Sequence, residues 1–165
     1  MPTPTYTPLA TVTLGTAAAS VTFSSIPATY RDLILISYAK SVSSDSNIRA
    51  RFNSDTGSNY SYVRMIGTGS AASSDSTTTT GLQVGRQTNT GESGFGMGIA
   101  HIMDYSATDK HKTVLVRSDN ASAATVGLAG RWANTAAITS IVLASFETAT
   151  NFAAGTTFSL YGVIA

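Results

Sequence analysis

Short apolar segments separated by Gly, Ser, Thr, Asn and Asp recur along the chain from Leu9 onward. Several of these segments alternate apolar and polar residues with a period of two, which is typical of β-strands with one buried face. Residues 48–52 are the clearest case, because Ile48, Ala50 and Phe52 point to one side while two arginines point to the other. Further strands are predicted over residues 10–14, 20–24, 31–39, 60–66, 94–105, 112–117, 124–132, 138–146 and 156–164.

Three parts of the chain lead to more specific predictions. Residues 10–14 and 20–24 flank Gly15 and a run of small residues, a pattern that predicts a β-hairpin. Residues 31–39 form a nearly continuous apolar run, so we expect a central strand that is covered on both faces. Residues 67–81 are polar and of low complexity, and this composition predicts a long surface loop.

The number of strands and their close spacing favour a β-sandwich. Ser, Thr, Ala and Gly dominate the composition, whereas Lys and Glu, which favour surface helices, are rare. We therefore predict an all-β fold, with one antiparallel, jelly-roll-like β-sandwich domain over residues 10–165. Residues 1–9 contain Pro2, Pro4 and Pro8 and are predicted to form an extended N-terminal arm. This arm is either a frayed end or a segment that docks on a neighbouring subunit.

The charge balance and the lack of cysteine exclude several classes of function. Charged residues make up 12% of the chain, and ten basic against nine acidic residues give a net charge of +1. Nucleic-acid-binding proteins normally have a basic excess, so no nucleic-acid partner is expected. The absence of cysteine excludes disulfides, thiolate catalysis and cysteine-ligated metals. No apolar stretch approaches the roughly 18 residues of a membrane span and no signal peptide is apparent, so we expect synthesis in a cytoplasm and no membrane partner.

The two histidines and the acids near them are the first candidates for chemistry. His101 and Asp104 lie close in sequence to Asp109 and His111, so paired strands would gather imidazole and carboxylate ligands for a divalent metal. No tight ligand spacing supports this, and such side chains usually form local hydrogen bonds, so no metal ligand is predicted. The oxygen-rich segment 53–59 invites calcium but lacks the ligand run of an EF-hand, and a turn explains it as well.

Motifs of enzymes and phosphate-binding proteins are absent or incomplete. The chain has no Gly-x-Ser-x-Gly elbow for a serine nucleophile. Gly85, Gly91 and the series Gly94, Gly96 and Gly98 do not follow the Gly-x-Gly-x-x-Gly pattern of a phosphate loop, and alternating glycines in a strand more often mark close packing. We therefore predict a protein that is not an enzyme, with no catalytic, cofactor-binding or metal-binding residues and no cofactor.

One set of arginines is interleaved with aromatic residues, as on a surface where single-stranded nucleic acid stacks its bases. Three of these arginines lie opposite apolar strand positions, where a solvated outer face is expected instead. Carbohydrate recognition through exposed tyrosine and tryptophan stays open. The set comprises Arg49, Arg51, Arg64 and Arg131, with Phe52, Tyr60, Tyr62 and Trp132.

Three segments, residues 26–33, 51–61 and 158–163, carry a resemblance to known proteins. With them the chain resembles small β-sandwich virion structural proteins of tailed bacteriophages, closest to those of cyanophages. That group includes head decoration (cement) proteins and tail-fibre components. The resemblance implies a homotrimeric decoration protein that binds the major capsid protein and stabilises the head, located on the capsid surface after assembly in the host cytoplasm. The alternative is a tail-fibre or receptor-binding module that recognises a host surface glycan.

Overall fold

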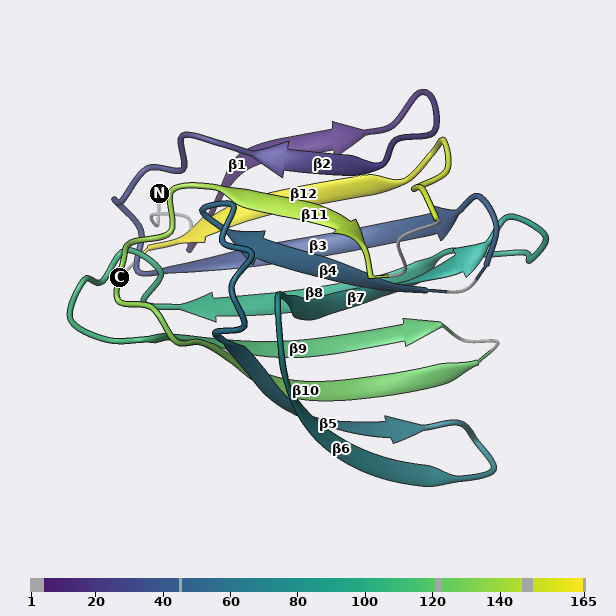
Figure 1. Cartoon of the computed structure of the whole chain (residues 1–165). Helices are drawn as coiled ribbons and strands as arrows, with labels where there is room; N and C mark the ends of the chain where they lie inside the picture. Colours follow the sequence, from purple (N-terminus) through teal and green to yellow (C-terminus); the bar gives the residue numbers. More distant parts are fainter. Residues whose placement is uncertain (1–4, 45, 121–122, 147–149, 165) are drawn as a thin grey trace.

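The computed structural model describes residues 5–44, 46–120, 123–146 and 150–164, and all regular elements in it are strands (Figure 1). Among these residues there is no helix long and apolar enough to span a membrane. The strands are β1 (Tyr6–Thr13), β2 (Ser20–Phe23), β3 (Asp32–Ser41), β4 (Ser46–Phe52), β5 (Tyr60–Gly67), β6 (Ala72–Thr79), β7 (Leu82–Asn89), β8 (Gly96–Met103), β9 (Lys112–Asn120), β10 (Ala124–Trp132), β11 (Ile141–Ser145) and β12 (Thr157–Val163).

The strands form two packed layers that are joined along one side. The large sheet has the order β1-β12-β3-β8-β9-β10-β5-β6, and every neighbouring pair in it is antiparallel. The small sheet has the antiparallel order β2-β11-β4-β7. A short parallel pairing of β3 with β7, at Lys40–Thr88 and Ser41–Asn89, links the two sheets.

The predicted antiparallel β-sandwich is therefore confirmed, with that parallel contact as the one exception among the described strands. The chain crosses repeatedly between the layers, as in a jelly roll, because β2, β4, β7 and β11 belong to the small sheet and the strands between them to the large one. The hairpin of β5 and β6 lies at the far edge of the large sheet (Figure 1).

The core lies between the two sheets and follows the period-two pattern of the sequence. Ile48, Ala50 and Phe52 are fully buried, whereas the two arginines between them are only half-buried, as predicted. Phe52 packs edge-on against Trp132 with ring centroids 5.6 Å apart, and Tyr60 stacks on the same indole. Other core side chains come from both layers: Leu33, Leu35, Ala100, Ile102, Val114, Val116, Val126, Leu128, Phe158, Leu160, Leu82, Val84, Ile141 and Leu143.

Two local predictions are wrong. Residues 10–14 and 20–24 do not pair as a hairpin, because β1 pairs with β12 in the large sheet and β2 with β11 in the small one. The small residues after Gly15 carry the chain from one layer to the other, and Ala18 forms a bridge with Phe152 on the way. The predicted loop over residues 67–81 contains the edge strand β6, which pairs with β5 along its whole length.

The predicted arm over residues 1–9 is described from Thr5 onward. Tyr6–Leu9 is extended as predicted, but it forms the first half of β1 and pairs with β12 of the same chain. Pro8 lies next to an irregularity in that pairing, which suits a residue without a backbone N–H at a sheet edge. Residues 1–4 lie outside the described residues.

The apolar strand β3 is central in the large sheet, between β12 and β8, as predicted. Its predicted coverage on both faces is wrong. Leu33 and Leu35 are buried against the small sheet, whereas Ile34 and Ile36 on the opposite face are only half-buried and Tyr38 is exposed. The described part of the chain therefore leaves one apolar face of the large sheet uncovered.

Candidate functional site

The candidate site is the outer face of the large sheet, defined as the side chains of β3, β8, β9, β10 and β5 that point away from the small sheet. Successive side chains of a strand point to opposite faces, so the residues between the core positions form this face. Six of its large apolar side chains are between 41% and 68% exposed: Tyr38, Val63, Met65, Met97, Ile99 and Leu115.

The register of the strands makes these side chains neighbours. Tyr38 lies directly opposite Met97 in the pairing of β3 with β8. Ala129 on β10 lies between Leu115 on one side and Val63 on the other. Directly opposed residues on one face of a sheet have Cβ atoms roughly 5 Å apart, so the apolar side chains form two groups, one on β3 and β8 and one on β9, β10 and β5. Where the groups meet, Met97 is opposite Asp119, Ile99 is opposite Arg117 and Leu115 is opposite His101. We call the two groups together the apolar band.

Exposed apolar side chains are concentrated on the outer face. Six of the nine large apolar residues that are exposed in the described part of the chain lie on it. Such concentrations usually mark a contact with protein, a ligand or a membrane. The outer face is therefore the feature of the described structure that most needs a functional explanation.

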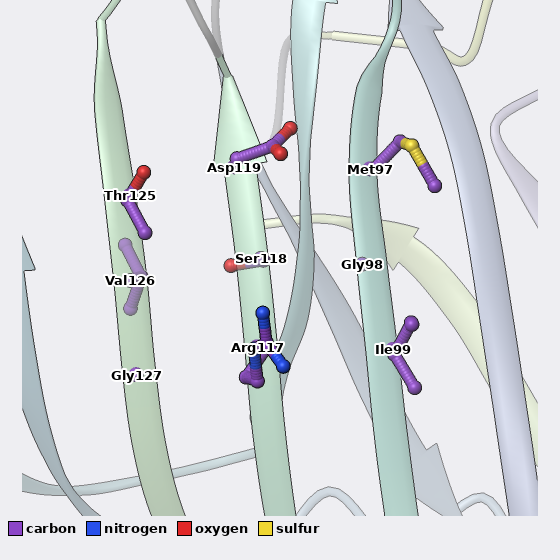
Figure 2. A pocket seen from close by; sticks show the side chains of 9 residues that line it. All are labelled: Met97, Gly98, Ile99, Arg117, Ser118, Asp119, Thr125, Val126 and Gly127. Carbon is purple, nitrogen blue, oxygen red and sulfur yellow. The ribbon is translucent and has the colours of Figure 1, made fainter.

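A shallow depression of about 390 Å³ lies in the middle of the outer face, over β8, β9 and β10 (Figure 2). Met97 and Ile99 line it from β8, and Arg117 and Asp119 line it from β9. On the β10 side it is lined in part by Gly127, where a Cβ atom would meet nothing within 4 Å. Two further depressions continue the hollow towards β5 and β6.

Two charged side chains lie within the apolar band. Arg117 and Asp119 are two residues apart on β9, so both belong to the outer face. Arg117 is opposite Ile99 on one side and Gly127 on the other, and it forms no ion pair with any described residue. An exposed cation among apolar groups, with an acid beside it, provides polar specificity for whatever covers this face.

The predicted metal candidates are not brought together. His101 Nε2 lies 3.0 Å from Asp32 Oδ2, whereas the Asp104 carboxylate faces Lys110 at 3.5 Å and His111 is exposed. No group of three or more potential ligands occurs in the part of the chain that the structure describes. The acid that His101 does contact, Asp32, precedes an apolar run and carries no recognisable sequence signal.

Asp32 organises the end of the outer face next to β12. Burial disfavours its charged form, but hydrogen bonds from the backbone N–H of Asp104, from His101 and from Arg31 outweigh this and lower the pKa of its carboxyl group. Only Arg31 is a local donor, because His101 and Asp104 lie 69 and 72 residues further along the chain. The expectation of a local hydrogen bond is therefore wrong for His101. The cluster thus fixes strand ends and has the features of a structural site.

The oxygen-rich segment 53–59 forms a turn, the alternative to calcium binding. Asp55 accepts hydrogen bonds from the backbone N–H of Gly57, from Asn59 Nδ2 and from Trp132 Nε1, at 2.7–2.8 Å. Its oxygens therefore have protein donors, and the turn is tied to the aromatic core.

The glycines that resemble a phosphate loop serve close packing. A Cβ atom on Gly98 would lie 2.6 Å from the backbone oxygen of Val84, and one on Gly96 would overlap the backbone at Arg86. Both positions face β7, which approaches the large sheet closely because no side chain intervenes.

The arginine and aromatic set does not form a stacking surface. Phe52, Tyr60 and Trp132 are at most 1% exposed, so nucleic-acid bases cannot reach them. Arg64 makes a bidentate ion pair with Asp75 on β6 and also donates to Gln83.

Lys112 is a buried base that sequence analysis missed. Burial lowers the pKa of its ammonium group, and Nζ donates to the backbone oxygens of Lys110 and Thr135 at 2.9 and 3.2 Å. It points to the interior at the start of β9 and does not line the depression of Figure 2. Its contacts close a loop and give it no access to a substrate.

Comparison with family models, with curated proteins and with solved structures finds no match for this chain.

Proposed function

We propose that this chain is a non-enzymatic structural protein of a bacteriophage virion, most specifically a decoration protein that binds the head shell and stabilises it. The observation that carries the proposal is the outer face, where exposed apolar side chains gather on a sheet whose other side is a packed core. The class of particle comes from the resemblance of residues 26–33, 51–61 and 158–163 to phage virion proteins.

The shape of the outer face favours a protein partner over a small molecule. Small-molecule sites are concave and enclose most of their ligand. Here the depression of Figure 2 is lined by three residues from each of three neighbouring strands and opens across the sheet. A broad, shallow apolar surface with a few charges matches the core of a protein–protein interface.

Binding at a repeated lattice explains how such a small chain would stabilise a shell. A protein that binds only the assembled state shifts the equilibrium towards that state by mass action. Repetition around a symmetric particle adds avidity, since neighbouring contacts raise the effective concentration of each one.

A receptor-binding role on a tail fibre is the second candidate, and one observation favours it. Tyr38 is exposed and stacks on Phe95 with ring centroids 4.3 Å apart, and Lys40 Nζ lies 5.1 Å from the Phe95 ring. Aromatic faces with a polar neighbour suit a sugar ring. Trp132, the residue first considered for this role, is buried and therefore unavailable.

The deciding experiment is quantitative mass spectrometry of purified virions, with the major capsid protein as internal standard. We expect copies on the scale of the capsid lattice. A handful of copies per particle would favour the tail-fibre role, and glycan binding by wild type against Tyr38→Ala would then be measured. Absence from the particle would overturn both roles.

A further inference from the structure

We propose that a second copy of this chain covers the outer face, so that two large sheets pack face to face around a two-fold axis. The inference rests on the proposed function in one respect, namely that the outer face is buried against protein. It names a second copy as the occupant of that face, so a head shell would be contacted by other surfaces of the dimer.

The first argument is the concentration of exposed apolar side chains. Six of the nine in the described part of the chain lie on the outer face, and stable interfaces bury roughly 800 Å² on each partner. Half-buried Ile34 and Ile36 continue the band on β3. Face-to-face packing of two sheets, with strands inclined by roughly 30°, is a common way to bury such surfaces.

The second argument is a glycine that the chain itself does not need. Gly127 lies in the middle of β10, where glycine is less favourable than alanine. Its φ is not in the left-handed region, and a Cβ atom there would meet no neighbour. By contrast, a Cβ atom on Gly130 of the same strand would meet Leu82 at 2.8 Å. The outer face therefore has room at Gly127 for a side chain of the second copy.

The third argument is charge, and it selects the symmetry. β9 is the middle strand of the apolar band, and Arg117 and Asp119 lie on either side of Ser118. Consider a two-fold axis that lies between the two sheets and runs across the strands above Ser118. It places residue 117 of one copy opposite residue 119 of the other. Arg117 of each copy then faces Asp119 of the other, which gives two ion pairs in the centre of the interface.

A three-fold axis along the strands does not have this property. It keeps each residue at the same height along the axis in every copy, so Arg117 would approach Arg117 of the neighbouring copies. Like charges at the centre of an apolar contact are strongly unfavourable. The charges of the outer face thus favour a dimer over the homotrimer that the resemblance implies.

The experiment uses the full chain and measures its association by sedimentation equilibrium. Wild type is expected at about 34 kDa, twice the mass of one chain. Arg117→Asp and Asp119→Arg are each expected to raise the dimer Kd about 100-fold, and the double variant is expected to return it to within about 10-fold of wild type. Lys110→Glu, a charge reversal on an exposed residue outside the band, is the matched control and leaves the Kd unchanged.

Gly127→Val provides a second, independent readout. Because the added side chain meets open space in the single chain, circular dichroism and the Tm of the monomer should be unchanged or higher. The dimer Kd should nevertheless rise about 10-fold or more, since the hollow is filled. If a charge reversal unfolds the chain, this variant decides the question.

Several outcomes would overturn the inference: a wild type that stays monomeric or forms a trimer, a dimer indifferent to both charge reversals, or a double variant as weak as the single ones. These outcomes are separate from the failure of the proposed function. A dimer with the expected charge dependence that is absent from virions would keep the inference and remove the phage role. A chain abundant in virions but monomeric alone would do the reverse.

Discussion

The inner and outer faces of the large sheet belong to the same strands, but the same types of residue have different surroundings on the two faces. On β9, Val114 and Val116 are buried in the core, whereas Leu115 between them is 46% exposed. On β10, Gly130 faces the core where a side chain would clash, whereas Gly127 faces open space. Residues on the inner face are explained by contacts within the chain. Those on the outer face are not, and the second copy proposed above would supply the missing contacts.

The strongest way to break this comparison is to truncate one large apolar side chain that packs against the inner face and one that belongs to the outer face. We expect Phe52→Ala to lower the free energy of unfolding of the monomer by about 3–5 kcal/mol, because Phe52 is fully buried against Trp132. Val63→Ala should change it by less than about 0.5 kcal/mol, because Val63 is 57% exposed. Urea titrations at a dilution where only monomer is present measure both values. Equal losses would mean that the outer face is packed within the chain.

A smaller effect with opposite signs is expected when alanine replaces a glycine on each face. Gly98→Ala should lower the free energy of unfolding by about 1–3 kcal/mol, because its methyl group would meet backbone atoms of Val84 and Gly85 at 2.6 and 2.7 Å. Gly127→Ala should raise it by about 0.5–1 kcal/mol, because alanine restricts the unfolded chain and meets no neighbour. Thermal unfolding of the two variants beside wild type tests the pair. A loss in both would contradict the distinction between the faces.

The third expected effect concerns the polar anchor of the inner face. Burial alone would raise the pKa of Asp55, but hydrogen bonds from Trp132, Gly57 and Asn59 outweigh it and lower that pKa below 3.8 in the folded state. Asp55 therefore contributes stability above about pH 4, and this contribution is lost as the pH falls through its folded pKa. We expect Asp55→Asn to cost about 1–2 kcal/mol near neutral pH.

The measurement is the free energy of unfolding of wild type and Asp55→Asn from neutral pH down to acid. The difference between the two proteins should be largest at neutral pH and should shrink below about pH 4. Parallel curves over the whole range would show that Asp55 does not anchor the Trp132 indole by its charge.

Most strands could be predicted because their apolar residues face a core and so repeat with a period of two. β6 was missed because Ala72–Thr79 buries almost nothing, and an edge strand without an apolar face has no such pattern. β7 was missed as well, because only Leu82 and Val84 among its residues are large and apolar. The pairing of β1 was mispredicted because a turn signal at Gly15 describes only local geometry, whereas the partner of β1 lies far along the chain.

The candidate site was partly visible in the sequence. The continuous apolar run over residues 31–39 correctly indicated that both faces of β3 are apolar, but it could not tell whether the same chain covers both. The charged pair Arg117 and Asp119 had no motif, and it gains meaning only from the register that places it in the middle of the band.

The position of β12 has a consequence for how the chain folds during synthesis. β12 is inserted between β1 and β3, so the large sheet is incomplete on that side until residues 157–163 have been made. Until then the edges of β1 and β3 present unpaired backbone groups, the kind of edge that promotes aggregation. The sheet between β1 and β3 therefore cannot be completed before β12 has been made. Slow translation or truncation before residue 157 would leave a nascent chain that is prone to aggregate.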